Sequence, residues 1–150
     1  MPGTYVCVKP TRESVDIIKR IMNKAGIPNN VCIPGNKLHS TILYDKDTPI
    51  GNLSPSNTQH RVEVVGAEVM GEGKWRAVVL KLKAPSLTRR WNYFIYSGYK
   101  HSYPSFKPHL SLAYGDDAEL YLQSVRNALS QMPQIVLWFD QEVIEPLKDD

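Results

Sequence analysis

Apolar positions in the first third of the chain follow a strand spacing, then a helix spacing, then a strand spacing again. Residues 5–8 are a short β-rich run, and Thr11 after it can cap a helix. The apolar face of that helix consists of Val15, Ile18, Met22 and Ala25. Gly26 and Pro28 end the helix, and residues 38–44 form the next strand after a turn-rich segment.

The middle of the chain has the pattern of a β-hairpin. Residues 61–70 are rich in β-branched side chains, and residues 75–83 form a second run with alternating side-chain character. The connection between them, residues 71–74, contains two glycines and favours a turn. These two strands should therefore pair in the antiparallel sense rather than through a β-α-β crossover.

The rest of the chain predicts two more helices and two more strands. Ser86 is the expected cap of a helix that Gly98 ends, and residues 110–114 form a strand after it. The acidic residues 116–117 suit the start of a third helix, because negative charge is favourable at a helix N-terminus. Residues 135–144 close the chain as a strand.

This order of elements predicts a single α+β domain that spans residues 1–150. The domain should contain two comparable halves, in each of which a helix and a loop lead into a strand that carries a histidine. A length of 150 residues, with 42% hydrophobic and 22% charged residues, is typical of one soluble globular domain.

Charge and targeting signals narrow the expected partners. The chain has 18 Lys and Arg against 15 Asp and Glu, and this formal charge of +3 is too small for a protein that tracks a long nucleic acid. A compact phosphate-bearing ligand in a locally basic cleft fits better. No apolar stretch reaches the ~18 residues of a membrane span, and residues 1–5 lack a secretory signal, so we expect a cytoplasmic protein without a membrane partner.

Two of the four histidines lie in the same local pattern, LHSTILY and PHLSLAY. Side chains alternate between the two faces of a strand, so His39 and Thr41 project from one face, as do His109 and Ser111. One histidine with a hydroxyl two residues later is too common to indicate a site. Two copies on strands from distant parts of the chain are more specific, and each also has an aromatic residue three positions after its hydroxyl.

This pair of motifs suits phosphodiester cleavage without a metal. The reaction needs a base, an acid, and hydrogen-bond donors for the phosphoryl oxygens. Histidine serves both proton roles, because its unperturbed pKa of ~6.5 leaves both forms populated near neutral pH. The sequence therefore predicts His39 and His109 as the acid–base pair, with Thr41 and Ser111 as donors. We expect no metal, since neither cysteine has a His or Cys at metal-ligand spacing.

The paired strands resemble those of the two-histidine (2H), or LigT-like, phosphoesterase superfamily. Further segments are similar to phage anti-CBASS phosphodiesterases, namely residues 4–8, 27–29, 37–41, 103–112 and 142–147. The resemblance implies a bilobal fold, with two antiparallel sheets around a central cleft and helices on the outside. It also implies a cyclic di- or trinucleotide substrate, no cofactor, and action in the cytoplasm of a bacterial host.

The resemblance also assigns substrate-binding residues. Tyr5 and Trp75 match positions that stack on nucleobases, and stacking tolerates different bases. A carboxylate in the C-terminal segment matches one that reads the adenine edge, with Glu142 preferred to Glu145, although strand polarity alone leaves both open. The family commonly has Thr in the second motif, where Ser111 keeps the hydroxyl but lacks the methyl that restricts its rotamer.

The other aromatic and basic residues have simpler interpretations. The loop 99–107 carries Tyr99, Lys100, His101, Tyr103 and Lys107. This loop either contacts a phosphate, with Lys107 as the best candidate, or packs against the core. Trp91 is expected in the core, because it shares a helix face with apolar residues, whereas His60 and His101 are expected at the surface.

The expected mechanism begins when one histidine deprotonates a ribose 2′-hydroxyl, which attacks the adjacent 3′-5′ phosphate. The other histidine protonates the departing 5′-oxygen, so the first product ends in a 2′,3′-cyclic phosphate. The sequence does not say which imidazole is the base. Two alternatives stay open: an RNA-processing 2H enzyme that acts on 2′,3′-cyclic phosphates or 2′-5′ linkages, and a module that binds nucleotides without turnover.

Overall fold

The computed structural model describes residues 2–148, which form an α+β fold as predicted. The strands of this part of the chain are β1 (Thr4–Pro10), β2 (Ser40–Asp45), β3 (His60–Met70), β4 (Ala77–Lys83), β5 (His109–Tyr114) and β6 (Val136–Pro146). The helices are α1 (Arg12–Lys24), α2 (Pro85–Tyr96) and α3 (Ala118–Ser130), with the 3-10 turns η1 (Gly35–Lys37) and η2 (Gly73–Trp75). Between residues 2 and 148, no helix has the length and apolar character needed to cross a membrane.

All six strands belong to one sheet, in the order β2-β1-β6-β3-β4-β5, with every neighbouring pair antiparallel. This differs from the two sheets that the family resemblance implied. The reason lies in the two long strands, β3 and β6, which each have 11 residues and two partners. Residues 136–139 of β6 pair with residues 60–63 of β3, and this pairing joins what would otherwise be two three-stranded sheets.

The strand order is symmetric about the joint between β6 and β3. On one side, strands β6, β1 and β2 form the first half of the molecule, and α1 connects β1 to β2. On the other side, β3, β4 and β5 form the second half, and α2 connects β4 to β5. This arrangement confirms the prediction of two comparable halves, in each of which a helix and a loop lead into a strand. His109 is the first residue of β5, whereas His39 lies just before β2 and not within the strand expected for it.

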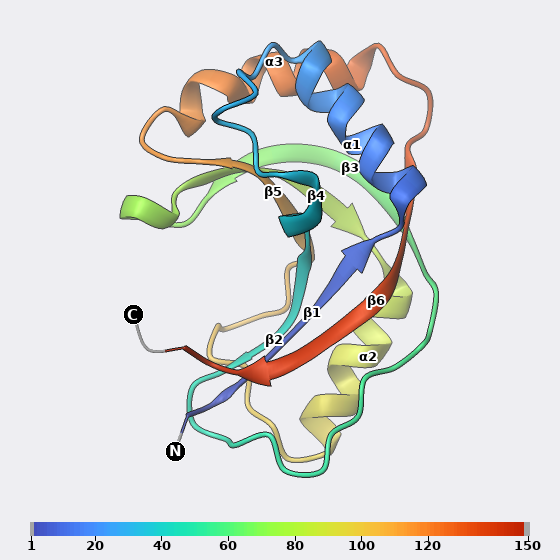
Figure 1. Ribbon diagram of the computed structural model, residues 1–150, viewed down its shortest axis with the longest axis vertical. Coiled ribbons are helices and arrows are strands. Elements are labelled where there is room, and N and C mark those ends of the chain that lie inside the picture. The colour runs from blue at the N-terminus through green and yellow to red at the C-terminus, as the bar shows by residue number, and fades with distance from the viewer. Residues whose placement is uncertain (1, 149–150) are drawn as a thin grey trace.

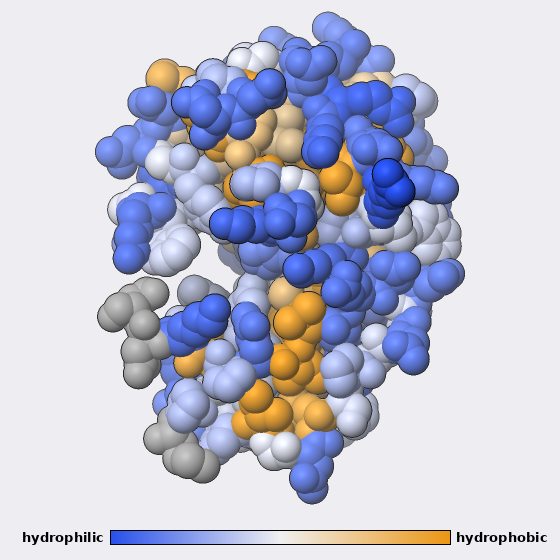
Figure 2. Space-filling view, in the orientation of Figure 1, coloured by the Kyte–Doolittle hydropathy of each residue, from blue (hydrophilic) through white to orange (hydrophobic). Residues whose placement is uncertain are grey.

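The sheet is strongly curved, and its two edge strands approach each other. Cα atoms of β2 and β5 come within 8 Å, although these strands stand at opposite ends of the sheet order. Figure 1 shows the curve as a C, with the three helices on its outer side. Figure 2 shows a notch in the surface on the open side of this C.

The hydrophobic core fills the space between the sheet and the helices. Strands β1 and β4 supply every second side chain to it, including Val6, Val8, Val78 and Leu80. The predicted cap of α1 is confirmed, because the Ser14 backbone N–H donates to Thr11 Oγ1 at 3.2 Å. The opposite face of the same strands is left for the concave side of the sheet.

Two expectations about individual residues of the second half need correction, and a third is confirmed. Helix α2 begins with Pro85 after Ala84, so Ser86 does not cap it, because proline already has the backbone angle of a first helical residue. Trp75 lies in the turn η2 and not in a strand. Trp91 does pack against the core, as expected, and its ring stacks on Phe106 with centroids 5.6 Å apart.

The two histidines expected at the surface are partly or fully buried. His60 is only 2% exposed, because it lies at the joint between β3 and β6, and its Nδ1 is 2.6 Å from Ser86 Oγ. His101 is half-buried beside Trp91, and its Nδ1 accepts the backbone N–H of Tyr44 at 3.3 Å. Burial lowers the pKa of both imidazoles, so both are neutral at pH 7.

Candidate active site

Each motif strand contains a β-bulge, at the same position in both. In the first half, Cys7 pairs with Thr41 but Val6 pairs with Leu43, so Ile42 is an extra residue. In the second half, Val79 pairs with Ser111 but Val78 pairs with Ala113, and Leu112 is the extra residue there. A bulge shifts every later side chain to the other face of the strand.

The bulges place a tyrosine beside each histidine and hydroxyl. Simple alternation would put Tyr44 on the face opposite Thr41, and Tyr114 opposite Ser111. With the extra residue, Tyr44 returns to the face of Thr41, where its ring lies 6.5 Å from that of Tyr5. The sequence carries one sign of this, since two consecutive buried residues follow the hydroxyl in both motifs.

A hydrogen bond to a backbone carbonyl fixes the orientation of each candidate catalytic imidazole. His39 Nδ1 lies 2.8 Å from the carbonyl oxygen of Lys37, and His109 Nδ1 lies 2.8 Å from that of Lys107. A carbonyl oxygen only accepts, so Nδ1 must carry the proton in both rings. Nε2 of the neutral imidazole is therefore free to take a proton, and both rings are partly exposed to solvent.

The two hydroxyls have different surroundings. Thr41 Oγ1 is 2.8 Å from the Tyr5 hydroxyl, and either group can be the donor. Burial raises the pKa of Tyr5 well above its ordinary value, so this phenol stays protonated at neutral pH. Ser111 has no side-chain hydrogen bond to any residue that the structure describes.

One cavity touches both motifs, through His39 and Tyr114, whereas Thr41, His109 and Ser111 do not line it. This cavity of about 390 Å³ is lined by His39 from the first half and by Tyr114 from the second, together with residues 31–34. The chain just before His39 crosses onto β5, because Ile33 donates its N–H to the Leu112 carbonyl at 2.8 Å. Together with the close approach of β2 and β5, this contact brings the first motif to the second.

Two buried side chains lie on the same strand face as the hydroxyls. Cys7 pairs across the sheet with Thr41, and Val79 pairs with Ser111. Both are buried, although neither belongs to the core between sheet and helices. Burial raises the pKa of the Cys7 thiol to about 11, so it is a neutral, apolar neighbour and not a thiolate nucleophile.

Each of the two candidate stacking residues lies beside a motif residue. The Tyr5 ring is 6.4 Å from the His39 ring, in an edge-to-face arrangement. The Trp75 ring is 5.8 Å from that of Tyr114, also edge-to-face. Trp75 is 54% exposed, a large fraction for tryptophan, and the Lys74 ammonium lies over its ring at 5.2 Å from the centroid.

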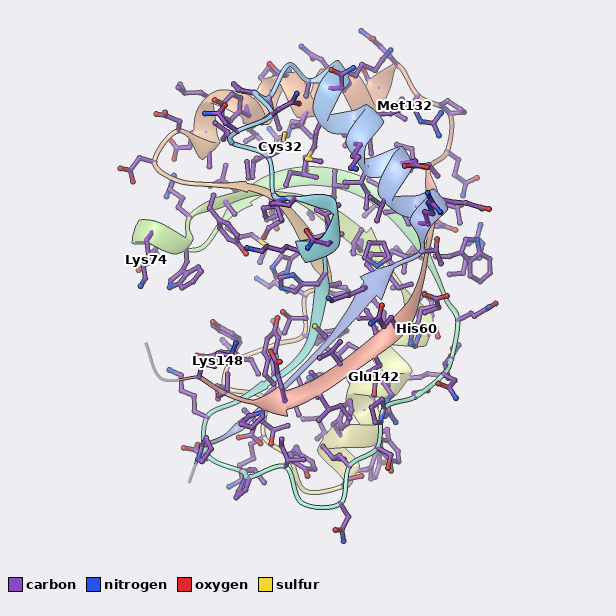
Figure 3. The ribbon with its side chains drawn as sticks, viewed as in Figure 1. Cys32, His60, Lys74, Met132, Glu142 and Lys148 are labelled. Carbon is purple, nitrogen blue, oxygen red and sulfur yellow. The ribbon has the colours of Figure 1, made fainter. Side chains whose placement is uncertain are left out.

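Glu142 is not on the face that carries the motif residues. Its carboxylate forms a bidentate ion pair with Arg90, at 2.7 and 2.9 Å, and accepts the Ser56 N–H at 3.1 Å. Figure 3 shows Glu142 and His60 on the side of the sheet near α2, away from the open side of the curve. The preference for Glu142 over Glu145 is therefore not supported, since Glu145 is the residue that pairs with Tyr5 and shares its face.

Lys107 lies at the end of the loop that precedes β5. Its side chain is exposed, and its carbonyl orients His109.

The buried Asp45 carboxylate accepts the Lys100 N–H at 2.7 Å, and this contact fixes the loop that precedes β5 against the first half. Contacts with that loop, including Tyr103 against Tyr44 at 5.3 Å, also help to hold the two halves together.

The sequence interpretation missed one lysine near each histidine. Lys81 pairs directly with His109 in the antiparallel ladder of β4 and β5. In the first half the ladder of β1 and β2 ends at Val8 and Ser40, and Lys9 and His39 are the residues next to this last pair. Cross-strand pairing cannot be read from one strand alone, and no local signal in the sequence identifies these lysines.

Metal-binding side chains are not clustered in the described part of the chain. Between residues 2 and 148, no group of three or more His, Cys, Asp and Glu side chains is placed to hold a metal ion.

Comparison with known proteins finds one phage family. The family model described as "Anti-CBASS protein Acb1" matches residues 2–150. Three relatives carry that same name. The protein of Salmonella phage S16 is 29% identical over 154 residues, which cover 97% of this chain and 89% of the relative. The protein of Vibrio phage KVP40 is 32% identical over 117 residues (76% and 74%), and that of Enterobacteria phage T4 is 29% identical over 150 residues (99% and 90%).

Proposed function

Because this chain belongs to the anti-CBASS protein Acb1 family, we propose that it counteracts CBASS by cleaving the cyclic di- and trinucleotide signals of that defence. The reaction is a metal-independent phosphodiester cleavage of the 2H phosphoesterase type. It takes place in the cytoplasm of the bacterial host, where such signals are made.

One observation supports this proposal most directly: the two imidazoles have the same local geometry. Each has Nδ1 at 2.8 Å from the carbonyl of the residue two positions earlier, and each is followed by a hydroxyl on the same face. One imidazole lies just before β2 and the other at the start of β5, and Cα atoms of these strands approach within 8 Å. Two such groups suit a reaction with one proton removed and one delivered at the same phosphorus.

In the proposed step, one proton leaves the attacking oxygen and one proton reaches the departing oxygen. Nε2 of one neutral histidine takes the proton of a ribose 2′-hydroxyl, and the 2′-oxygen forms a bond to the adjacent phosphorus. The bond from phosphorus to the 5′-oxygen breaks, and the imidazolium of the other histidine gives that oxygen its proton. The product is linear and ends in a 2′,3′-cyclic phosphate, which water can then hydrolyse.

The neighbouring residues have supporting roles in this proposal. Thr41 and Ser111 donate hydrogen bonds to the phosphoryl oxygens, whose negative charge increases in the transition state. Tyr5 and Trp75 stack on two nucleobases, and Lys107 attracts a phosphate. Glu145, on the face of Tyr5, accepts a hydrogen bond from the exocyclic amine of adenine.

The decisive experiment is incubation of the purified protein with 3′3′-cGAMP in EDTA, followed by mass spectrometry. We expect linear products, with a 2′,3′-cyclic phosphate at early times. An analogue without the attacking 2′-hydroxyl should stay intact, and its rapid cleavage would exclude this route. An intact cGAMP that binds with measurable affinity would instead indicate a non-catalytic nucleotide-binding module.

A further inference from the structure

A second cavity, of about 520 Å³, lies between η1, the start of α1 and the ends of β1 and β6. Its lining includes Lys9, Arg12, Lys19, Gly35, Asn36 and Gln141. The turn η1 contributes to both cavities, because its first two residues line this one and its third, Lys37, lines the cavity beside His39.

This cavity is strongly basic. Its lining contains three cationic side chains and no carboxylate. Among residues 2–148, Lys9, Arg12 and Lys19 form no ion pair with an acidic side chain. Like charges that line a concave surface focus the electrostatic potential there, and this potential attracts anions. A phosphate, with its several acceptor oxygens, matches this set of donors.

The cavity adjoins the candidate active site along β1. Alternation places Lys9 on the same face as Cys7 and Tyr5, and its backbone neighbour on β6 is Gln141. The ladder between β1 and β2 ends at Val8 and Ser40, so Lys9 and His39 are the residues next to its last pair. A ligand that lies along this face therefore meets Tyr5, the scissile position and the basic cavity in succession.

Close packing connects the cavity wall to His39. A Cβ atom added to Gly35 would lie 3.0 Å from Val15 Cγ1 and 3.1 Å from Lys19 Cε, so η1 is pressed directly against α1. The last residue of η1, Lys37, supplies the carbonyl that orients the His39 ring. An anion bound in this cavity would thus contact the segment that positions one catalytic imidazole.

We propose that Lys9, Arg12 and Lys19 form a second phosphate subsite. It holds a non-scissile phosphate of the same cyclic oligonucleotide whose scissile phosphate lies between the two imidazoles. This inference rests on the proposed function. The surroundings differ in the second half, where the lysine opposite His109, Lys81, has Gly66 as its β3 neighbour and lies 4.0 Å from the carboxylate of Glu68.

The test compares two substrates that differ in their number of phosphates. A cyclic dinucleotide has a scissile and a second phosphate, whereas the linear dinucleoside monophosphate ApA has only the scissile one. The triple variant K9Q/R12Q/K19Q should raise the KM for the cyclic dinucleotide about tenfold or more, since it removes charge-assisted contacts. Its KM for ApA should stay within about twofold of the wild-type value, because that substrate never reaches the subsite.

A matched control removes the same charge from elsewhere. The variant R20Q/K24Q/K83Q changes three exposed cations that line neither cavity. It should leave both KM values unchanged at physiological salt, because exposed charges far from the ligand are screened. A rise in KM of the K9Q/R12Q/K19Q variant that is equal for both substrates, or absent for both, would overturn the subsite.

Failure of the subsite is distinguishable from failure of the proposed function. If the wild-type protein cleaves neither substrate, the proposed function is wrong, and titration calorimetry with the intact cyclic dinucleotide then tests the subsite. Binding that is about tenfold weaker in K9Q/R12Q/K19Q than in the control variant would support it. Equal affinity, or the absence of binding to the wild type, would refute it.

Discussion

The two halves of the molecule share their reactive groups but differ in the residues around them. Both motif strands have a bulge after the hydroxyl, and both histidines donate Nδ1–H to a carbonyl two residues earlier. The position of Tyr5 in the first half is taken by Ala77 in the second, since Tyr5 pairs with Tyr44 and Ala77 with Tyr114. Tyr5 therefore has no counterpart at the equivalent strand position of the second half, where the aromatic residue beside Tyr114 is Trp75 of the turn η2.

The third strands of the two halves differ as well. In the first half Cys7 pairs with Val143 of β6, and in the second half Val79 pairs with Glu68 of β3. The basic cavity beside Lys9 is lined by residues of the first half. The two halves therefore share a duplicated apparatus, namely the motif histidine and hydroxyl with their bulged strand, and differ in the residues around it.

The largest expected effect tests the equivalence of the two imidazoles. The single variants His39→Ala and His109→Ala should both have a kcat that is lower by roughly 10²- to 10⁴-fold, because each variant lacks one of the two proton-transfer groups. Initial rates with 3′3′-cGAMP measure this loss, and circular dichroism checks that both variants stay folded. If one variant kept near-wild-type activity, the duplicated apparatus would not be the catalytic one.

Much of the fold could be predicted from the sequence, because it follows from local periodicity. The strand runs, the cap at Thr11 and the repeated halves depend on spacing within a few residues. The sequence did not predict a single sheet. The pairing of residues 60–63 with residues 136–139 is a contact between distant segments, and the residues of neither strand indicate it. Burial of His60 has the same origin, because it lies at that joint.

The sequence could predict only those features of the candidate site that depend on residues within a single motif. The sequence marks His39, Thr41, His109 and Ser111 by residue type and spacing, and their catalytic roles stay predictions. The ion pair of Glu142 could not be predicted, because the side of a strand that faces a helix cannot be inferred until the partner of the carboxylate, Arg90, is known. Lys9 and Lys81 are visible only through cross-strand register.

The second prediction contrasts two carboxylates on opposite faces of β6. Glu142→Gln leaves the guanidinium of Arg90, whose side chain is only 16% exposed, without its partner. Unfolding free energy should fall by about 3 kcal/mol, or roughly 6–12 °C in Tm, as for other buried pairs that lose one member. Glu145→Gln should leave Tm unchanged within ~1 °C, because that residue is in no such pair, and should instead reduce the preference for adenine over guanine. The reverse assignment of the two phenotypes would restore Glu142 as the base reader.

The third prediction concerns Tyr5, the residue without a counterpart in the second half. Tyr5→Ala removes the ring and should weaken substrate binding by ~1–3 kcal/mol, measured as Kd with a catalytically inactive His109→Ala background. Tyr5→Phe keeps the ring and loses only the hydrogen bond to Thr41, so its Kd should stay near that of the parent while kcat in the active background falls a few-fold. Equal Kd values for all three proteins would argue against stacking.

The fourth prediction is a pH dependence at the joint between the halves. Burial lowers the pKa of His60 in the folded protein, so the unfolded chain binds the proton more readily. The unfolding free energy should therefore be fully developed above the unfolded pKa of about 6.5 and should decline as pH falls below it. Urea denaturation at pH 8, 7, 6 and 5 measures this slope. A His60→Gln variant should show a shallower slope, and the remainder is expected from His101, whose pKa is also lowered by burial.

The smallest effect is expected when the hydroxyl residue of each motif is replaced by that of the other. Ser111→Thr adds the methyl that restricts the rotamer of a hydroxyl with no other side-chain partner, so kcat/KM should rise by about two- to threefold. Thr41→Ser removes that methyl, yet Tyr5 still holds the hydroxyl at 2.8 Å, so the same quantity should change by less than about twofold. Alanine at either position, measured alongside, gives the full contribution of each hydroxyl. A larger loss in Thr41→Ser than in Tyr5→Phe would mean that the methyl group, and not the tyrosine, fixes the donor of the first half.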